Sequence, residues 1–325
     1  MQTVILAVLV GFVAALGSGH FLIPVLQKLK AGQSIREDGP KSHLKKAGTP
    51  TMGGVFITLG VLAAAIIFLS VTGNYLWFAV IGATAFGLIG FLDDLIKVLK
   101  HRSLGLRPYQ KIVAQLLFAV LVSVYAYKNP AIGSTLYVPI LNVYWDLGIW
   151  YIPFTMFVLL AMTNCVNLTD GLDGLAGSVT LVNAAAFTLI FLPMIGQTVW
   201  GEDMAVFAGA LTGAILAFLR YNAYPAKVFM GDVGSFFLGG ALTMMGIVSR
   251  MQLILPLIGI MYVVSGLSCI LQVGSYKLRG GKRIFKMAPL HHHFELSGIH
   301  ETKIVCVYTI ITVICSLLVL LAVSK

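Results

Sequence analysis

Two long apolar runs flank the polar stretch Asn164-Cys165-Val166-Asn167-Leu168-Thr169-Asp170-Gly171-Leu172-Asp173-Gly174. Each run can cross a membrane, because a hydrocarbon core about 30 Å thick needs about 20 residues of helix. Amides and carboxylates recur at every third position of the stretch: Asn164, Asn167, Asp170 and Asp173. This spacing drifts by only about 60° per step around an α-helix, so the four side chains form a short polar stripe.

The stripe has two interpretations. In the simpler interpretation, the stretch is a helix end followed by a turn at Gly171 and Gly174, because Asp and Asn cap helices and Gly forms turns. A cap needs only one such side chain, however, and polar groups beside a bilayer are costly unless they serve a function. We therefore favour a site for a polar ligand or an ion.

The composition is that of an integral membrane protein. Of the 325 residues, 58% are hydrophobic and 10% are charged, whereas soluble domains have about 25% charged residues. The four cysteines lie in or beside apolar runs without a CxxC pair, which argues against a disulfide framework. The first apolar run has no convincing cleavage site, so we expect it to remain as a span.

We predict an all-α polytopic membrane protein that forms one domain over residues 1–325 and has ten transmembrane helices. An even number of spans puts both termini on the same side of the membrane. The ten predicted spans are residues 3–26, 53–71, 75–92, 112–127, 149–166, 175–195, 204–219, 234–248, 253–276 and 304–323.

The basic residues predict the orientation. Alternate loops on one side contain 19 of the 22 Lys and Arg residues, and the other side has only Lys128, Arg250 and Lys325. The positive-inside rule places the basic loops in the cytoplasm and both termini outside. Topology thus explains the net charge of +10, and no nucleic-acid partner is needed. The external residues 129–148 have the aromatic pattern of a small β-hairpin.

Acidic residues follow no inside rule, yet nine of the twelve also lie on the cytoplasmic side. Asp93 and Asp94 end the third predicted span. Neighbouring side chains on a helix point about 100° apart, so the two carboxylates are not expected to hold one ion in the same way. In a functional interpretation, one of the two carboxylates acts as a base and the other orients a metal ion or a lysine. The alternative is an interfacial stop paired with Lys97, three and four residues further on.

Asp232 opens the eighth span within Phe229-Met230-Gly231-Asp232-Val233-Gly234-Ser235. A capping role and a ligand role are equally consistent with this stretch. Its glycines allow close approach to the backbone, and the N-terminus of a helix favours an anion. Asn222, just upstream, adds an amide to the same side.

Two cytoplasmic loops are candidates for phosphate contacts. Residues 45–54, Lys45-Lys46-Ala47-Gly48-Thr49-Pro50-Thr51-Met52-Gly53-Gly54, lack the order of a P-loop and are only weakly typical of a phosphate-binding loop. The last loop contains Pro289-Leu290-His291-His292-His293-Phe294-Glu295. Consecutive histidines point in different directions, which argues against zinc, and with nearby basic residues they suit phosphate oxygens. An ordinary interfacial loop is the alternative.

Carboxylates and amides without a Cys or His ligand set favour Mg²⁺, which typically binds one or two carboxylates plus substrate phosphates. Phosphoryl transfer is then the expected reaction. At this point the motifs at residues 93–94, 164–174, 229–232 and 289–295 resemble those of the polyprenyl-phosphate N-acetylhexosamine-1-phosphate transferases. The histidine motif and residues 48–54 are most similar to the bacterial branch that transfers phospho-MurNAc-pentapeptide.

The resemblance implies transfer from UDP-MurNAc-pentapeptide to undecaprenyl phosphate, which gives lipid I and UMP in the first membrane step of peptidoglycan synthesis. It implies a multi-pass protein of the bacterial inner membrane with its active site on the cytoplasmic face, Mg²⁺ as cofactor, and a homodimer. By the same resemblance, Asp232 binds Mg²⁺, Asp93 deprotonates or orients the lipid phosphate, Asp94 supports Asp93, and His291 is a fourth catalytic group. The implied nucleotide-sugar site is lined by Lys46, Thr51, Asn167, Asp170, Gly171, Leu172, Asp173, Asn222, Phe229, Gln272, His291, His292 and His293.

Several alternatives stay open at this stage. The lipid phosphate attacks the β-phosphate directly, or an aspartate first forms a covalent phospho-sugar. We favour direct attack, since the acceptor is already an anion. A sibling enzyme that uses UDP-GlcNAc has the same fold, and the triple histidine argues against it. An ion-coupled transporter binds its solute near the bilayer midplane, whereas these motifs gather at one face.

Overall fold

The computed structural model describes residues 1–29, 46, 48–100 and 104–324. The α-helices are α1 (Gln2–Lys28), α2 (Gly54–Ile67), α3 (Asn74–Leu99), α4 (Pro108–Lys128), α5 (Tyr151–Thr169), α6 (Leu175–Phe191), α7 (Gly201–Asn222), α8 (Gly231–Val248), α9 (Leu255–Ile258), α10 (Ile260–Leu278), α11 (Leu290–Glu295) and α12 (Glu301–Val323). Short 3₁₀ helices are η2 (Gly148–Trp150), η3 (Leu192–Met194) and η4 (Gln252–Ile254), and the two strands are β1 (Thr135–Val138) and β2 (Val143–Asp146).

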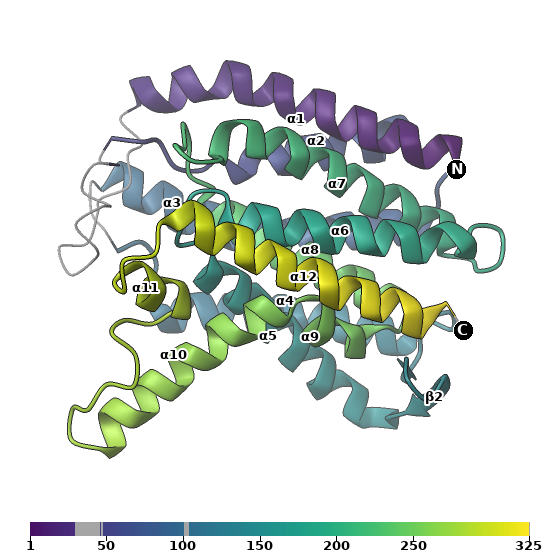
Figure 1. Cartoon of the computed structure of the whole chain (residues 1–325). Coiled ribbons are helices and arrows are strands. Elements are labelled where there is room, and N and C mark those ends of the chain that lie inside the picture. Colours follow the sequence, from purple (N-terminus) through teal and green to yellow (C-terminus); the bar gives the residue numbers. More distant parts are fainter. Residues whose placement is uncertain (30–45, 47, 101–103, 325) are drawn as a thin grey trace.

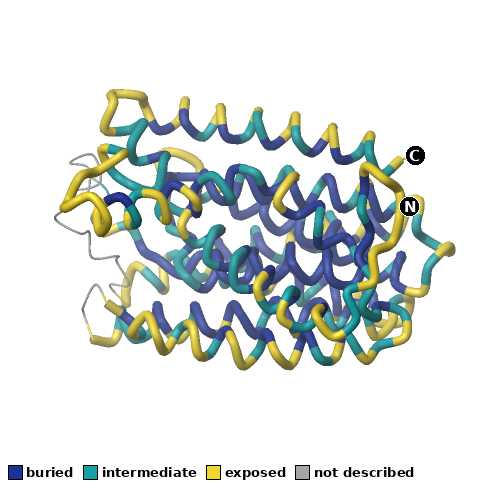
Figure 2. Tube along the Cα trace, turned by 90° about the horizontal axis from the view of Figure 1, so that it is seen from below, coloured by how far each residue is buried: buried dark blue, intermediate teal, exposed yellow. Residues whose placement is uncertain are grey.

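Most of the long helices run along one direction as a bundle, and α10 leans away from it (Figure 1). The centre of the bundle is α8, since 89% of its membrane-length window is buried, compared with 28% for α1, α4 and α12. Figure 2 shows the same division, with buried residues inside and exposed residues along the outer helices. Glycines allow close packing at the centre, because a Cβ on Gly54 would overlap the backbone of Gly234.

The predicted helical, membrane-spanning architecture is confirmed, but the count of ten spans is not. Each predicted span has a helix, and eight of these helices are long and apolar enough to cross a membrane. The predicted span 53–71 contains α2, which has only 14 residues. The predicted span 253–276 is bent by 80° between α9 and α10. It is broken at Gly259, whose N–H closes the last turn of α9 on Leu255 at 2.8 Å.

The hairpin predicted within residues 129–148 is present. Strands β1 and β2 pair antiparallel, with Thr135 opposite Asp146 and Val138 opposite Val143. Arg250 holds the hairpin, since its Nη2 donates to the carbonyl of Ala131 at 2.6 Å and its backbone carbonyl accepts from the N–H of Tyr137 at 2.8 Å. Both chain termini lie at the hairpin end of the bundle, and α11 lies at the opposite end (Figure 1).

Candidate functional site

Three aspartates meet where α3 ends and α8 begins. The carboxylates of Asp93, Asp94 and Asp232 each offer a ligand atom, and these atoms lie within 4.8 Å of one another. Among the described residues, no other group of three or more His, Cys, Asp or Glu side chains is placed to hold a metal ion. Asp93 and Asp94 are 0% and 1% exposed. Buried carboxylates this close repel each other strongly, so they need cations.

Two lysines supply the positive charge. Lys97 Nζ lies 2.6 Å from Asp93 Oδ2, 3.1 Å from Asp94 Oδ1 and 3.2 Å from Asp232 Oδ2. Lys111, at the start of α4, lies 3.0 Å from Asp93 Oδ1 and 2.6 Å from Asp232 Oδ2. We call these five residues the carboxylate–lysine cluster. It brings α3, α4 and α8 together and leaves one net negative charge.

The expectation that Asp93 and Asp94 diverge is only partly right. One oxygen of each carboxylate accepts a hydrogen bond from a different backbone segment. Leu106 N–H donates to Asp93 Oδ1 at 2.7 Å, and Val233 N–H donates to Asp94 Oδ2 at 3.1 Å. Their other oxygens converge on Lys97. The pairing with Lys97 that the interfacial-stop interpretation required is therefore present, but both carboxylates are buried in a cluster instead of facing the membrane surface.

The polar stripe of residues 164–173 separates in space. Asn164 Nδ2 donates to Gln115 Oε1 on α4 at 2.7 Å. Asn167 Nδ2 donates to Asp232 Oδ1 and to Ser235 Oγ, both at 2.9 Å, and so joins α5 to the carboxylate–lysine cluster. Asp170 follows the end of α5. Burial, followed by the charges of Asp232, Asp94 and Asp173, raises its pKa to about 8.

A second ionic centre lies around Lys46. Its Nζ lies 2.8 Å from Asp173 Oδ1 and 2.6 Å from Glu301 Oε2 at the start of α12. Burial lowers the pKa of Lys46, but the two carboxylates outweigh burial and raise it above the ordinary value. The other oxygen of Asp173 accepts the N–H of Ala226 at 3.0 Å. Lys46 therefore joins the first loop, the turn after α5 and the start of α12.

Residues 49–54 are bonded to the segment that leads into α8. Gly53 N–H donates to the carbonyl of Phe229 at 2.9 Å, and Phe229 N–H donates to the carbonyl of Pro50 at 2.8 Å. Thr51 is buried next to Gly231, which starts α8 with a φ of +76°. These bonds fix the backbone of Phe229, whose side chain is half-buried and which precedes Asp232 by three residues in the sequence.

The turn between α5 and α6 contains Gly171, the buried Leu172 and Asp173. Gly174 ends it with a φ of +77°, as expected for a turn glycine. Asn222 Oδ1 accepts the Gly174 N–H at 3.1 Å, and Asn222 Nδ2 donates to the carbonyl of Val228 at 2.9 Å. The amide of Asn222 thus supports the backbone of two site segments.

The three histidines of α11 take different directions. The imidazole of His291 is buried and lies so close to Gly171 that a Cβ there would overlap its Nε2. His292 also lies near Gly171, and its Nδ1 is 3.3 Å from Glu295 Oε2. His293 Nδ1 accepts the backbone N–H of Lys286 at 3.1 Å. Gln272 likewise bonds the backbone of this loop, accepting from Phe285 N–H at 2.9 Å.

Sequence reasoning missed Lys111, Glu301 and Ser235 as members of these two centres. Lys97 is signalled by its spacing from Asp93 and Asp94. Lys111 and Glu301 carry no such signal, because they reach partners 121 and 255 residues away in the chain.

The chemistry of this end of the bundle is that of phosphoryl transfer. Buried carboxylates able to hold a hard cation lie beside lysines, and a second polar centre and a histidine pair lie next to the turn after α5. The corresponding class is the membrane-embedded glycosyl transferases, and the model of glycosyl transferase family 4 matches residues 76–250. A second model, phospho-N-acetylmuramoyl-pentapeptide-transferase signature 1, matches residues 46–57.

The full-length relatives narrow the class further. The chain is 47% identical over 325 residues to the phospho-N-acetylmuramoyl-pentapeptide-transferase of Clostridium novyi, with 100% of this chain and 98% of that protein covered. It is 48% identical to the Clostridium kluyveri enzyme of that name, with 97% of both chains covered, and 49% identical to the one from Clostridium perfringens strain 13, with 96% of both covered. The chain belongs to the phospho-N-acetylmuramoyl-pentapeptide-transferase family.

Proposed function

We propose that this protein transfers phospho-MurNAc-pentapeptide from UDP-MurNAc-pentapeptide to undecaprenyl phosphate. The products are lipid I and UMP, and the reaction is the first membrane step of peptidoglycan synthesis. The observation that carries the proposal is the 47% to 49% identity to phospho-N-acetylmuramoyl-pentapeptide-transferases along nearly the whole chain. The signature over residues 46–57 supports it, because those residues include Lys46 and Thr51 at the site end of the bundle.

The reaction exchanges one phosphorus–oxygen bond for another. An oxygen of the lipid phosphate attacks the β-phosphorus of the donor, the bond from that phosphorus to the bridging oxygen breaks, and UMP leaves with the bridging oxygen. We propose that Asp93 accepts a proton from the lipid phosphate or orients it, and that Asp94 and Lys97 hold Asp93 in place. Direct attack is favoured because the acceptor is already anionic and needs positioning more than activation.

The donor set of the carboxylate–lysine cluster fits Mg²⁺. Mg²⁺ prefers oxygen ligands and is usually held by one or two carboxylates together with substrate phosphates. We propose Asp232 as its ligand, with Asp93 and Asp94 close enough to contribute. When bound, the ion would neutralise charge that develops on the donor diphosphate. Asn167 orients Asp232 through the 2.9 Å hydrogen bond to its Oδ1.

We place the nucleotide-sugar next to the turn after α5, where Gly171, Leu172 and Asp173 form the uridine pocket with Phe229. Lys46 and His291 lie at this turn, the first paired with Asp173 and the second packed on Gly171. We assign His291 a catalytic role there. Asn222 and Gln272 then act by holding backbone segments of the pocket. The other proposed contacts are Thr51, Asn167, Asp170, His292 and His293.

We further propose ten spans in one domain, with both termini outside the bacterial inner membrane and the site at the cytoplasmic face. The basic loops support this orientation. Both termini lie at the same end of the bundle, which supports an even number of membrane crossings (Figure 1). In that arrangement α2 and the bent α9–α10 pair are the two irregular spans. A homodimer, as implied by the resemblance, is tested by the mass of the detergent-purified protein in light scattering.

The decisive experiment measures UMP release by the purified protein with undecaprenyl phosphate and Mg²⁺, offering UDP-MurNAc-pentapeptide and UDP-GlcNAc separately. Release only with the muramoyl nucleotide, lost with EDTA and restored by added Mg²⁺, is the expected result. Asp232→Ala should abolish it, and Asp146→Ala, an exposed aspartate of the hairpin, should not. Release only with UDP-GlcNAc would move the protein to the sibling branch. Solute accumulation in proteoliposomes without any UMP release would indicate a transporter instead.

A further inference from the structure

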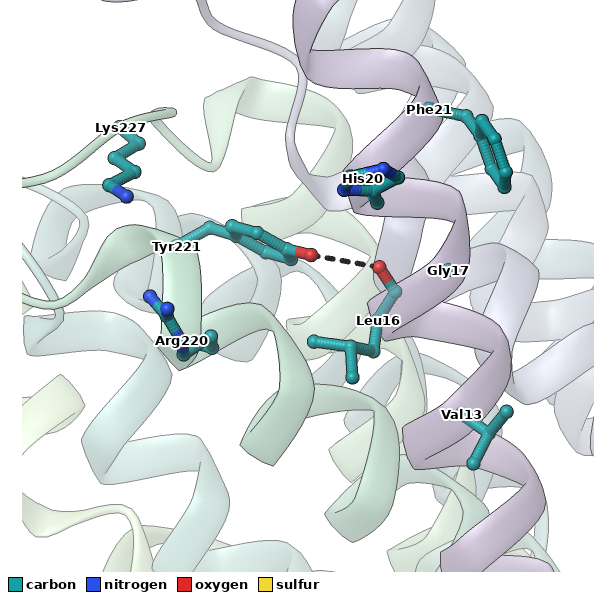
Figure 3. Close-up of a pocket in the computed structure, with 8 residues that line it drawn as sticks. All are labelled: Val13, Leu16, Gly17, His20, Phe21, Arg220, Tyr221 and Lys227. Carbon is teal, nitrogen blue, oxygen red and sulfur yellow. Dashed lines mark hydrogen bonds between the residues drawn. The ribbon is translucent and has the colours of Figure 1, made fainter.

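A pocket of about 640 Å³ lies between α1 and α7, and none of its lining residues belongs to the carboxylate–lysine cluster (Figure 3). We call it the α1–α7 pocket. This volume is within the range of about 300–1,000 Å³ that is typical of small-ligand sites. Its lining residues are Val13, Leu16, Gly17, His20, Phe21, Arg220, Tyr221 and Lys227.

The polar side of the α1–α7 pocket is basic, and no acidic side chain is among the described residues that line it. Arg220 and Lys227 turn their nitrogen ends toward the same space beside the ring of Tyr221, and His20 faces them from α1 (Figure 3). Within the described ranges, none of these three side chains forms an ion pair, in contrast to Lys46, Lys97 and Lys111. Two like charges that converge without a counter-ion favour an anionic ligand.

The other side of the pocket is apolar and faces outward. Val13 and Phe21 of α1 are 65% and 74% exposed, on a helix long and apolar enough to span a membrane. Side chains of this kind on a membrane helix contact lipid tails. A ligand that satisfies both sides therefore has an anionic head and an apolar tail. Basic pockets between membrane helices on the cytoplasmic side are suited to phospholipid head groups.

The end of α7 separates this pocket from the proposed donor site. Asn222 faces the turn after α5 and bonds Gly174 and Val228. Its neighbour Tyr221 points the other way, because its hydroxyl donates to the carbonyl of Leu16 at 2.9 Å and its ring packs against Phe56. The buried Gly19 gives the Tyr221 ring room to approach α1. The last residue of α7, Asn222, thus belongs to the proposed donor site, and the two residues before it, Arg220 and Tyr221, line the α1–α7 pocket.

We propose that the α1–α7 pocket binds the phosphate head group of an anionic bilayer phospholipid, with Arg220 and Lys227 on the phosphate and the acyl chains along Val13 and Phe21. This lipid is neither substrate nor product of the proposed reaction. It would fix the cytoplasmic end of α1 against α7. Because the bound lipid contacts α7, whose last residue is Asn222, it would also support the backbone of the donor site.

The test counts lipids bound to the detergent-purified full chain by native mass spectrometry, with phosphatidylglycerol and phosphatidylcholine of identical chains added separately. The wild-type protein should retain phosphatidylglycerol in preference to phosphatidylcholine. The double variant Arg220→Ala/Lys227→Ala should bind phosphatidylglycerol roughly 25-fold more weakly, since each of the two basic side chains near an anionic lipid contributes about a factor of five. Lys100→Ala/Lys303→Ala removes the same charge from exposed positions outside the pocket and should bind as the wild type does.

A second variant fills the pocket without changing its charge. A Cβ at Gly17, which lines the pocket, would meet nothing within 4 Å, so Gly17→Leu is designed to reduce the space in the pocket and adds a better helix former. It should lose phosphatidylglycerol as the double variant does. Gly274→Leu changes a glycine of α10 where a Cβ also meets nothing within 4 Å, and this control should bind phosphatidylglycerol as the wild type does. Retention of phosphatidylglycerol by Gly17→Leu, equal loss in the control variants, or displacement of the lipid by millimolar inorganic phosphate would each overturn the proposal.

Discussion

Lys111 Nζ lies 2.6 Å from Oδ2 of Asp232, and this ion pair joins the start of α4 to the start of α8. The same oxygen is 3.2 Å from Lys97 Nζ, so two cations share one carboxylate oxygen. Lys97 comes from the helix that carries Asp93 and Asp94, but Lys111 comes from a different helix. Lys111 therefore fixes the position of Asp232 relative to α3 as well as supplying charge.

Removing Lys111 should disable the proposed reaction. Lys111→Ala leaves three clustered carboxylates with one lysine, and we expect kcat for UMP release to fall by about 100-fold, as for the loss of other preorganised charges. Lys111→Arg keeps the charge and should retain more activity than Lys111→Ala. Lys100→Ala, an exposed lysine at the end of α3, is the matched control. Activity of Lys111→Ala within about twofold of the control would remove Lys111 from the proposed site.

The contact between Gly171 and His291 makes a second prediction. A Cβ at position 171 would overlap His291 Nε2, so Gly171→Ala must displace the imidazole or the turn after α5. We expect kcat/KM for the donor to fall by about tenfold or more, since small misplacements of site groups are costly. Gly274→Ala adds the same methyl group where nothing lies within 4 Å and should behave as the wild type.

A further variant separates the two causes of that loss. His291→Ala removes the imidazole that obstructs the new methyl group, so the effects of Gly171→Ala and His291→Ala should not add in the double variant. Fully additive losses would show that Gly171 acts independently of His291.

The sequence predicts the elements of this protein better than their contacts. Apolar runs of membrane length give the positions of the helices, because period and length are local properties. The bend at Gly259 and the short α2 are not evident, since both lie within runs that are apolar throughout. The pairing of Lys97 with Asp93 follows from helical spacing. The pairing of Lys46 with Glu301 depends on how α12 docks, which no local pattern encodes.

The direction in which a polar side chain points is also invisible in the sequence. Asn222 and Gln272 are amides that the resemblance to the transferase family places at the nucleotide-sugar site. In the structure their amides bond backbone groups, at 2.9 Å from Asn222 Nδ2 to Val228 and at 2.9 Å from Phe285 to Gln272 Oε1. Asn167, in contrast, reaches Asp232 directly. Whether such an amide bonds the backbone or a site residue depends on how its helix is rotated and how the loops dock, and both are properties of the tertiary structure.

Asp170 makes stability depend on pH. Its pKa is about 8 in the folded protein, because of burial and the neighbouring aspartates, against 3.8 ordinarily. Between these values the folded state binds more protons than the unfolded state, so stability falls as pH rises, by up to about 1.4 kcal/mol per pH unit. We expect the Tm of the wild-type protein in detergent to decrease from pH 5 to pH 8. The Tm of Asp170→Asn should decrease less over this range, and at pH 7 this variant should be more stable than the wild type.

The matched control for that measurement is Asp146→Asn on the hairpin. Hydrogen bonds from Ser134 and from the Gly148 N–H lower the pKa of Asp146, so it stays ionised throughout this range. Its substitution should leave the slope of Tm with pH as in the wild type. An Asp170→Asn protein whose Tm follows the wild-type curve at every pH would show that Asp170 is ionised in the folded state.

Asp203 stabilises the opposite end of the bundle from the site. It lies in the first turn of α7 and caps α3, because its Oδ1 accepts the Gly73 N–H at 2.6 Å and its Oδ2 accepts the N–H groups of Tyr75 and Leu76 at 3.0 and 3.1 Å. Asp203→Ala leaves three buried or half-buried donors without this acceptor. We expect the free energy of unfolding to fall by about 2–4 kcal/mol. A lowered Tm in detergent is the readout.

Glu202→Ala provides the comparison for Asp203, since it removes the same charge one residue earlier from a side chain that makes none of these bonds. It should change the Tm by no more than a surface substitution does. Both variants should release UMP at wild-type rates well below their Tm, because Asp203 of α7 caps the start of α3, whereas the carboxylate–lysine cluster lies at the other end of α3. A loss of kcat in Asp203→Ala at such temperatures would mean that the start of α3 also positions Asp93 and Asp94.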